Sequence, residues 1–220
     1  MNRQQFVKNG LLSLGALVSS SALLQACTQM ATPTGTSGAD GCTLSPSETK
    51  GPFPIKSPAE WVRSSIVSDR NGIPLMINIK VVDASCRPLA NTVVDLWHCD
   101  AAGDYSEYGG TGMQRTDYTN AHFLRGRQST DANGQVNFIS IYPGWYRGRA
   151  PHIHLEVLNS SGKSLIVSQI AFPEDVSQVV YATQDYNGAA DTSNTRDNVF
   201  RDSLELNMAD EVSGNTTEGY

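Results

Sequence analysis

Alternation of apolar and polar side chains is the feature that most restricts how this chain can fold. Every second position from 75 to 81 is apolar, occupied by Leu75, Ile77, Ile79 and Val81. Successive side chains of a β-strand point to opposite faces, so this pattern predicts a strand with one buried face. A helix needs apolar residues every three or four positions, and that spacing is scarce in this chain. We therefore expect a fold built mainly from strands.

Further extended segments follow, and turn signals separate them. We expect strands near 93–98, 136–141, 153–158 and 165–171. Asn133-Gly134 is strong turn chemistry because it accommodates positive φ. Several short strands between turns predict an all-β antiparallel β-sandwich, immunoglobulin- or prealbumin-like, with long loops and little helix. One short helix is expected near 174–180, and residues 186–220 should form an irregular polar tail whose last ten residues are loosely held.

The first 26 residues are organised like a secretory signal. Arg3 and Lys8 precede an apolar stretch, residues 11–24, that is too short to span a bilayer. Leu24-Gln25-Ala26-Cys27 then resembles a bacterial lipobox, in which the cysteine is acylated and becomes the new N-terminus. We expect export to the periplasm or cell envelope as a lipoprotein, anchored to the membrane only through lipid on Cys27. A soluble exported protein, cleaved nearby, is the alternative.

Composition and charge narrow the domain organisation and the classes of partner. We expect a signal peptide (1–26), a flexible tether (27–41) and one folded domain (42–220). The chain is 39% hydrophobic and 17% charged, which suits one globular core and excludes a disordered chain or a coiled coil. The formal net charge is −6 and the sequence has no basic run, which argues against nucleic acid as a partner.

The cysteines point to an oxidising compartment. If Cys27 carries lipid, three cysteines remain: Cys42, Cys86 and Cys99. One disulfide and one free thiol are then expected in an exported protein. The sequence does not decide which two cysteines pair.

Two histidines at alternate positions are the first candidates for chemistry. His152 and His154 share one face of the expected strand, while Ile153, Leu155 and Val157 share the other. The apolar face belongs to the core, so the imidazoles meet on the opposite surface, with Cα atoms about 7 Å apart. Neutral imidazoles at this spacing can bind one metal ion, and zinc, copper and non-haem iron fit the pair equally well.

Nearby phenols favour iron among these metals. Tyr146 lies six residues before His152, and Tyr105 lies in the loop after the strand expected at 93–98. A phenol has a pKa near 10, so ionising it at neutral pH needs a strong local positive charge, which a hard trivalent ion supplies. Two imidazoles and two phenolates therefore favour Fe(III) over zinc or copper.

Five motifs, in order along the chain, resemble the intradiol ring-cleavage dioxygenases. They are Cys42–Phe53 (CTLSPSETKGPF), Leu96–Ala101 (LWHCDA), Gly103–Ser106 (GDYS), Phe123–Gly126 (FLRG) and Tyr142–His154 (YPGWYRGRAPHIH). The resemblance runs from about Cys42 to Phe172 and is closer to short exported members than to the larger cytoplasmic catechol and protocatechuate enzymes. Lys50 stands where many members carry an acidic residue, and we interpret it as a surface variation.

The resemblance implies roles for six residues of this chain. Carried over by position, the iron ligands are Tyr105, Tyr146, His152 and His154. Tyr105 is then the phenolate that leaves when substrate binds, and Tyr146 the one that stays. Arg149 would face the substrate ring with Gln169 beside it, although Gln169 also suits an ordinary strand position.

The activity that the resemblance implies is that of a non-haem Fe(III) dioxygenase, an oxidoreductase of aromatic-compound catabolism. Its partners would be a small catecholic substrate and O₂. The ring would be cleaved between its two hydroxyl-bearing carbons, and both oxygen atoms would enter a muconate-type dicarboxylate. The identity of the catechol and the oligomeric state stay open, and residues 42–220 would be the catalytic domain.

Two other classes of protein remain as alternatives. One is a non-catalytic, surface-anchored β-sandwich binding module, which the fold alone would permit. The other is a zinc or copper protein that uses only His152 and His154 with different ligands. Among the remaining polar side chains, His98 is interpreted as a structural histidine and His122 as a solvent-facing loop residue. Arg125 and Arg127 are interpreted as surface or loop-anchoring charges.

Overall fold

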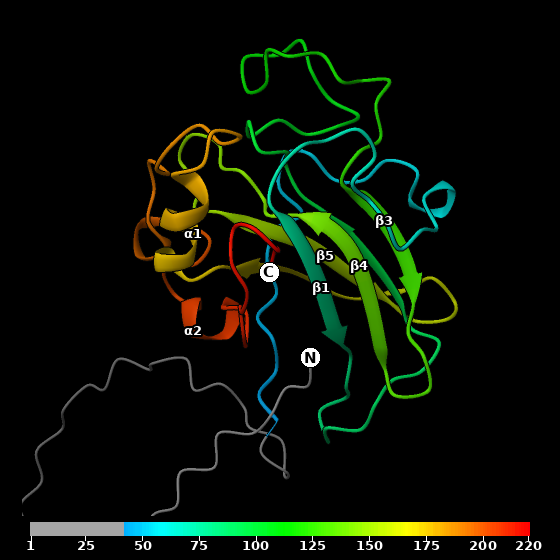
Figure 1. The fold of residues 1–220 in the computed structure, drawn as a ribbon. Helices are drawn as coiled ribbons and strands as arrows, with labels where there is room; N and C mark the ends of the chain where they lie inside the picture. The colour runs from blue at the N-terminus through cyan, green and yellow to red at the C-terminus, as the bar shows by residue number, and fades with distance from the viewer. Residues whose placement is uncertain (1–41) are drawn as a thin grey trace, which may run out of the picture.

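The computed structural model describes residues 42–220, which form two antiparallel sheets with the two short α-helices on one side (Figure 1). The strands are β1 (Pro74–Lys80), β2 (Val93–Trp97), β3 (Arg125–Ser129), β4 (Gln135–Ile141), β5 (His152–Leu158) and β6 (Ser164–Ala171). The helices are α1 (Glu174–Tyr181) and α2 (Leu204–Asn207), with 3-10 turns η1 (Pro58–Glu60) and η2 (Asn194–Arg196). The signal peptide (1–26) and tether (27–41) expected from the sequence lie outside the described residues.

The strands pair as two sheets that enclose one core. β1 and β4 form a two-stranded sheet, and the second sheet has four strands in the order β3-β2-β5-β6. Each of these pairings is antiparallel. Side chains from both sheets belong to a single hydrophobic cluster, including Ile77, Leu96, Phe138 and Leu155. The prediction of an all-β antiparallel fold with little helix is confirmed, and α1 lies where the short helix was expected.

The structure differs from the sequence-based expectations in two segments. The polar sequence of β3 has no apolar alternation, yet all of its residues pair with β2, from Trp97↔Arg125 to Val93↔Ser129. The C-terminal residues are not loose either. The Tyr220 backbone N–H donates to the Pro74 carbonyl (2.9 Å), and the Met76 N–H donates to the Tyr220 carbonyl (2.8 Å). Pairing with a strand edge that is distant in sequence orders both segments.

A disulfide joins Cys42 to Cys86, and Cys99 is a buried free thiol. The bridge fixes the first described residue to the loop between β1 and β2. Within residues 42–220, no helix has the length and apolar character that crossing a membrane requires.

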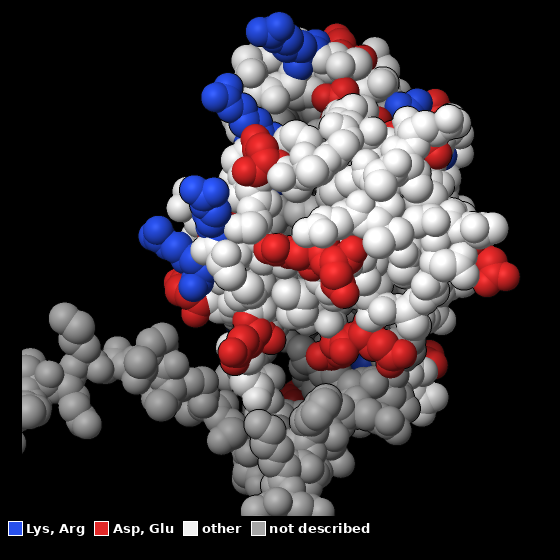
Figure 2. All heavy atoms as spheres, turned by 60° about the vertical axis from the view of Figure 1, so that its left-hand side comes forward, with Lys and Arg blue, Asp and Glu red and all other residues white. Residues whose placement is uncertain are grey.

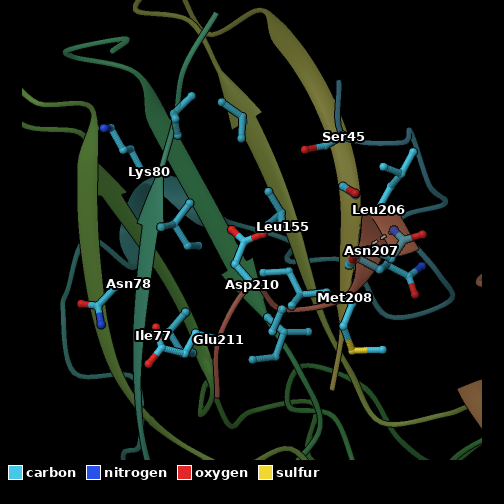
Figure 3. Close-up of a pocket in the computed structure, with 18 of the residues that line it drawn as sticks. Ser45, Ile77, Asn78, Lys80, Leu155, Leu206, Asn207, Met208, Asp210 and Glu211 are labelled. Atoms are coloured by element: carbon cyan, nitrogen blue, oxygen red, sulfur yellow. Dashed lines mark hydrogen bonds between the residues drawn. The ribbon is translucent and has the colours of Figure 1, made fainter. Parts of the chain in front are cut away.

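A cavity of about 560 Å³ lies between the two sheets. Figure 3 shows Ile77 of β1 and Leu155 of β5 in its lining, with Asp210 and Glu211 nearby. Because side chains alternate along a strand, His152 and His154 of β5 point to the opposite side of the sheet from Leu155. The cavity and the histidines are therefore separated by the four-stranded sheet.

The face that carries α1 and α2 is acidic. Figure 2 shows Asp and Glu side chains spread across the centre of this face, with Lys and Arg mainly along one edge. This distribution agrees with the formal net charge of −6.

Candidate metal centre

One row of side chains across the four-stranded sheet carries the candidate site. The ladder register places its members directly opposite one another, in the order Arg125 (β3), Trp97 (β2), His154 (β5) and Gln169 (β6). Residues opposite each other in an antiparallel ladder project from the same face. Leu155, the neighbour of His154, belongs to the core, so this row projects away from the core and under the loops.

The two histidines of β5 direct their Nε2 atoms toward each other. His152 Nε2 and His154 Nε2 are 3.1 Å apart, and both side chains are buried. His152 Nδ1 lies 2.6 Å from the Ala150 carbonyl, so Nδ1 carries the proton and the Nε2 lone pair faces the site. The His154 ring stacks on Trp97 with centroids 5.1 Å apart and planes 2° apart. This stacking fixes the plane of the second imidazole.

Two phenols complete a cluster around His152 Nε2. Tyr105 Oη lies 3.5 Å from this nitrogen, and Tyr146 Oη lies 3.4 Å from it. Tyr105 comes from the loop after β2, and Tyr146 from the loop before β5. The structure therefore brings together the four residues that the sequence singled out as metal ligands.

Burial holds all four groups in their neutral forms in the absence of a cation. It lowers the pKa of His152 to about 3 and that of His154 well below the usual value. It also raises the pKa of Tyr105 well above that of a free phenol, and the pKa of Tyr146 is raised for the same reason. The imidazoles are thus neutral and able to act as ligands at ordinary pH. The phenols would ionise only beside a strong positive charge.

The donor set fits a ferric ion. Residues 42–220 contain no cluster of three or more His, Cys, Asp or Glu side chains of the kind that holds zinc or calcium. Only the two imidazoles and two phenols converge on one point, and hard phenolate oxygens suit a trivalent metal. The residues that would hold iron are Tyr105, Tyr146, His152 and His154.

Arg149 and Gln169 lie beside this cluster and orient each other. Arg149 Nη1 is 3.4 Å from both Tyr146 Oη and His152 Nε2, so its positive charge borders the site. Its Nη2 donates to Gln169 Oε1 (2.5 Å), and its Nε donates to Asp197 Oδ2 (2.8 Å). Gln169 Nε2 donates in turn to the Thr49 carbonyl (2.8 Å).

The sequence analysis missed the fully buried Asp197, because this residue stands in a polar segment without a motif.

Gln114 fixes the backbone of Tyr105 and was also missed. Its Oε1 accepts from the Tyr105 N–H (2.6 Å), and its Nε2 donates to the Tyr105 carbonyl (2.8 Å). The side chain amide thus pairs with Tyr105 as a neighbouring strand would. No local signal in the sequence marks a glutamine nine residues after a ligand as its partner.

A strap of residues 49–53 crosses over the imidazole of His154. At Gly51, which has a φ of +67°, a Cβ atom would lie 2.9 Å from His154 Cε1. Two residues on, the Phe53 ring stacks on Tyr105 with centroids 4.8 Å apart. The strap therefore needs glycine at 51 and covers one imidazole and one phenol.

Lys50 of the strap is exposed, as expected for a surface position, and it also pairs with a buried carboxylate. Its Nζ lies 2.5 Å from Glu156 Oε2, and Glu156 is a largely buried residue that follows His154 by two positions on the same face of β5. A buried carboxylate needs a cationic partner. Lys50 thus neutralises the charge of Glu156, which lies next to His154 on the same face of β5.

The remaining polar residues have structural partners. His98 is buried between the Cys99 carbonyl (2.7 Å) and Ser140 Oγ (2.6 Å), and burial lowers its pKa to about 4, as expected for a structural histidine.

His122 does not simply face solvent, because its ring stacks on the Trp61 ring with centroids 4.2 Å apart. Arg127 makes a bidentate pair with Asp95.

The chain belongs to the intradiol ring-cleavage dioxygenase family. The family model described as "Dioxygenase" matches residues 56–206, which include all six candidate site residues. An intradiol ring-cleavage dioxygenase from Tetranychus urticae is 36% identical and has a TM-score of 0.65, and the match covers 73% of this chain and 81% of that one.

Two curated relatives are similar over part of their length. Catechol 1,2-dioxygenase from Acinetobacter baylyi is 28% identical, over 79% of this chain and 58% of the relative. The protocatechuate 3,4-dioxygenase beta chain from Burkholderia cepacia is 33% identical, over 48% of this chain and 49% of the relative. The chain thus spans about half the length of the curated relatives it matches.

Proposed function

We propose that this protein is an Fe(III)-dependent dioxygenase that cleaves a catechol-type ring between its two hydroxyl-bearing carbons. The convergence of two imidazole nitrogens and two phenol oxygens beside the Arg149 guanidinium is the observation that carries the proposal. The reaction breaks one carbon–carbon bond of the ring and places both atoms of O₂ in the two new carboxyl groups. The catechol is oxidised and O₂ is reduced, so no further oxidant or reductant is needed.

The chain's own residues prepare the substrate for this reaction. Iron held by these residues would be chelated by both catechol oxygens and would make the ring carbons reactive toward O₂. Beside that cation Tyr105 would be a tyrosinate, and its Oη would accept a proton from a substrate hydroxyl. Tyr146, His152 and His154 would remain as the residues that hold the metal. Because the imidazoles are neutral, the positive charges that would stabilise an anionic substrate are those of the metal and of Arg149.

Arg149 supplies a permanent cation at the edge of the site. Its guanidinium stabilises anionic forms of the ring and of the opening product, which is most effective where water is excluded. Gln169 and Asp197 hold its Nη2 and Nε atoms, so Nη1 stays directed at the site. Gln169 therefore acts by orienting Arg149.

The proposal is tested by following both oxygen atoms. The iron-loaded protein is incubated with catechol, protocatechuate or hydroxyquinol under ¹⁸O₂, and O₂ uptake is compared with the mass of the product. We expect one O₂ consumed per substrate and two ¹⁸O atoms in a dicarboxylate. Substrate oxidation without ¹⁸O in the product, or no O₂ uptake with any of the three diols, would contradict the proposal.

We also propose that the protein is exported and anchored through lipid on Cys27. The lipobox-like sequence at 24–27 supports this location. The Cys42–Cys86 disulfide gives independent support, because such bonds persist in oxidising compartments outside the cytosol. The substrate would then be a diol met in the cell envelope.

A further inference from the structure

Arg125 is a fully buried cation at the end of the row that carries the site. A buried guanidinium is costly unless its donors are satisfied. Its Nε donates to Ser106 Oγ (2.9 Å), its Nη2 to the Ser106 carbonyl (2.6 Å) and its Nη1 to the Phe53 carbonyl (3.0 Å). All three acceptors lie in loops, so Arg125 is a buried charge that anchors loops, which is one of the two roles expected from the sequence.

Both segments that Arg125 binds also determine where Tyr105 lies. Ser106 is the next residue after Tyr105, and the Phe53 ring stacks on the Tyr105 ring with a 27° angle between the planes. Arg125 therefore fixes the backbone that carries the phenol and the residue that covers its face. The guanidinium carbon lies 5.9 Å from the Tyr105 ring centroid, and its hydrogen bonds go to Ser106 and Phe53 rather than to the phenol oxygen.

A second set of contacts holds Arg125 in this place. Glu107 Oε2 lies 3.6 Å from Arg125 Nε and accepts the Lys56 backbone N–H (2.9 Å). Glu107 has a φ of +67°, which is unusual for a residue other than glycine, so the surrounding contacts must stabilise this backbone. Lys56 Nζ donates to the Glu107 carbonyl (2.6 Å), and this hydrogen bond helps to stabilise the Glu107 backbone.

We propose that Arg125 is the positioning residue for Tyr105 and sets where the phenol oxygen stands relative to His152. The inference rests on the proposed function, because it takes Tyr105 as a ligand of iron. A guanidinium can reach three acceptors on two segments with one planar group, whereas a lysine ammonium on a flexible stem cannot reproduce that fork. Arg125 holds the backbone next to Tyr105 directly, and it reaches Tyr146 only through the ring contacts of Phe53 and Tyr105.

The test compares Arg125→Lys with Arg127→Lys in the iron-loaded full-length protein. Both substitutions keep a positive charge on β3, and Arg127 binds only Asp95 through its side chain hydrogen bonds. The visible absorption of the resting protein reports both tyrosinates. We expect the band to weaken or shift in Arg125→Lys and to match the wild type in Arg127→Lys.

Adding catechol without O₂ separates positioning from general damage. Once substrate displaces Tyr105, the remaining band depends on Tyr146 and the bound catechol. The spectra of Arg125→Lys and the wild type should then coincide, while kcat/KM in Arg125→Lys falls by about tenfold, the loss expected for one charged hydrogen-bond network. Spectra that still differ with catechol bound would show a general defect and overturn the proposal.

An unchanged resting spectrum in Arg125→Lys would overturn the inference while leaving the proposed function intact. A wild-type protein that binds iron without any tyrosinate band would overturn both. If Arg125→Lys does not fold, as far-ultraviolet circular dichroism would reveal, Ser106→Ala decides the matter. This variant removes the acceptor of Arg125 Nε, and we expect a smaller change of the resting band in the same direction; no change would overturn the inference.

Discussion

At the scale of single residues, the candidate site combines four neutral side chains with one permanent cation, the Arg149 guanidinium. Burial keeps His152 neutral, with a pKa of about 3, and it also opposes ionisation of Tyr105. A trivalent ion would reverse the second effect, because it stabilises a phenolate far more than water does. Burial thus raises the cost of an unpaired phenolate, so the two phenols would ionise only beside a highly charged metal.

Gly51 lies against His154 and leaves no room there for a larger side chain. In Gly51→Ala the new methyl group would lie 2.9 Å from His154 Cε1, so the imidazole or the strap must shift. We expect weakened iron retention, measured as bound iron after dialysis against a chelator. Gly162→Ala is the matched control, because Gly162 has a φ of +81° and open space around its Cβ position.

Both glycine variants should lose stability through the positive φ, by about 1 kcal/mol in thermal or denaturant unfolding. Only Gly51→Ala should also lose iron. Equal iron retention in the two variants would show that the strap does not constrain His154.

The sequence reveals residues whose role depends on local spacing. The alternation at 152–157 places both histidines on one face, and the motifs around Tyr105 and Tyr146 point to the phenols. Arg125 and Asp197 act through contacts with segments distant in the chain, such as the 72 positions between Arg125 and Phe53, whereas Gln114 binds Tyr105 nine positions before it. No motif marks Gln114 or Asp197, so the sequence analysis missed both, and for Arg125 it offered a loop-anchoring role without showing which loops are bound.

At the scale of elements, the sheet register assembles the site. β3, β2, β5 and β6 each contribute one residue to the row that runs from Arg125 to Gln169. All five expected strands match elements of the structure, namely β1, β2, β4, β5 and β6, because they alternate or are rich in β-branched residues. The polar strand β3 could not be predicted in this way, because its sequence does not alternate. It is extended because its backbone pairs with β2.

At the scale of the whole molecule, the candidate metal site and the cavity between the two sheets lie on different sides of one sheet. The cavity of about 560 Å³ contacts Leu155, while His154 faces the loops. The strap at 49–53 is tied to β6 by the hydrogen bond from Gln169 Nε2 to the Thr49 carbonyl, and the Cys42–Cys86 bridge ties the first described residue to the loop between β1 and β2. The N-terminal segment of the described domain therefore contributes to the cover of the candidate site.

Lipid attachment is a property of the whole chain and is tested in cells. In a bacterium that expresses the full-length protein and is fed radiolabelled palmitate, we expect label in the wild type and none in Cys27→Ser. The wild type should fractionate with membranes, and Cys27→Ser should be released in soluble form. Equal labelling of the two proteins would contradict the assignment of Cys27.

The visible absorption spectrum of the aerobically purified protein tests the central claim most directly. The account predicts a red-brown tyrosinate-to-iron band that moves to longer wavelength when excess catechol is added without O₂. Tyr146→Phe should lose much of this band, and Tyr118→Phe, which alters a tyrosine outside the site, should keep it. A protein that stays colourless after reconstitution with iron would contradict the account.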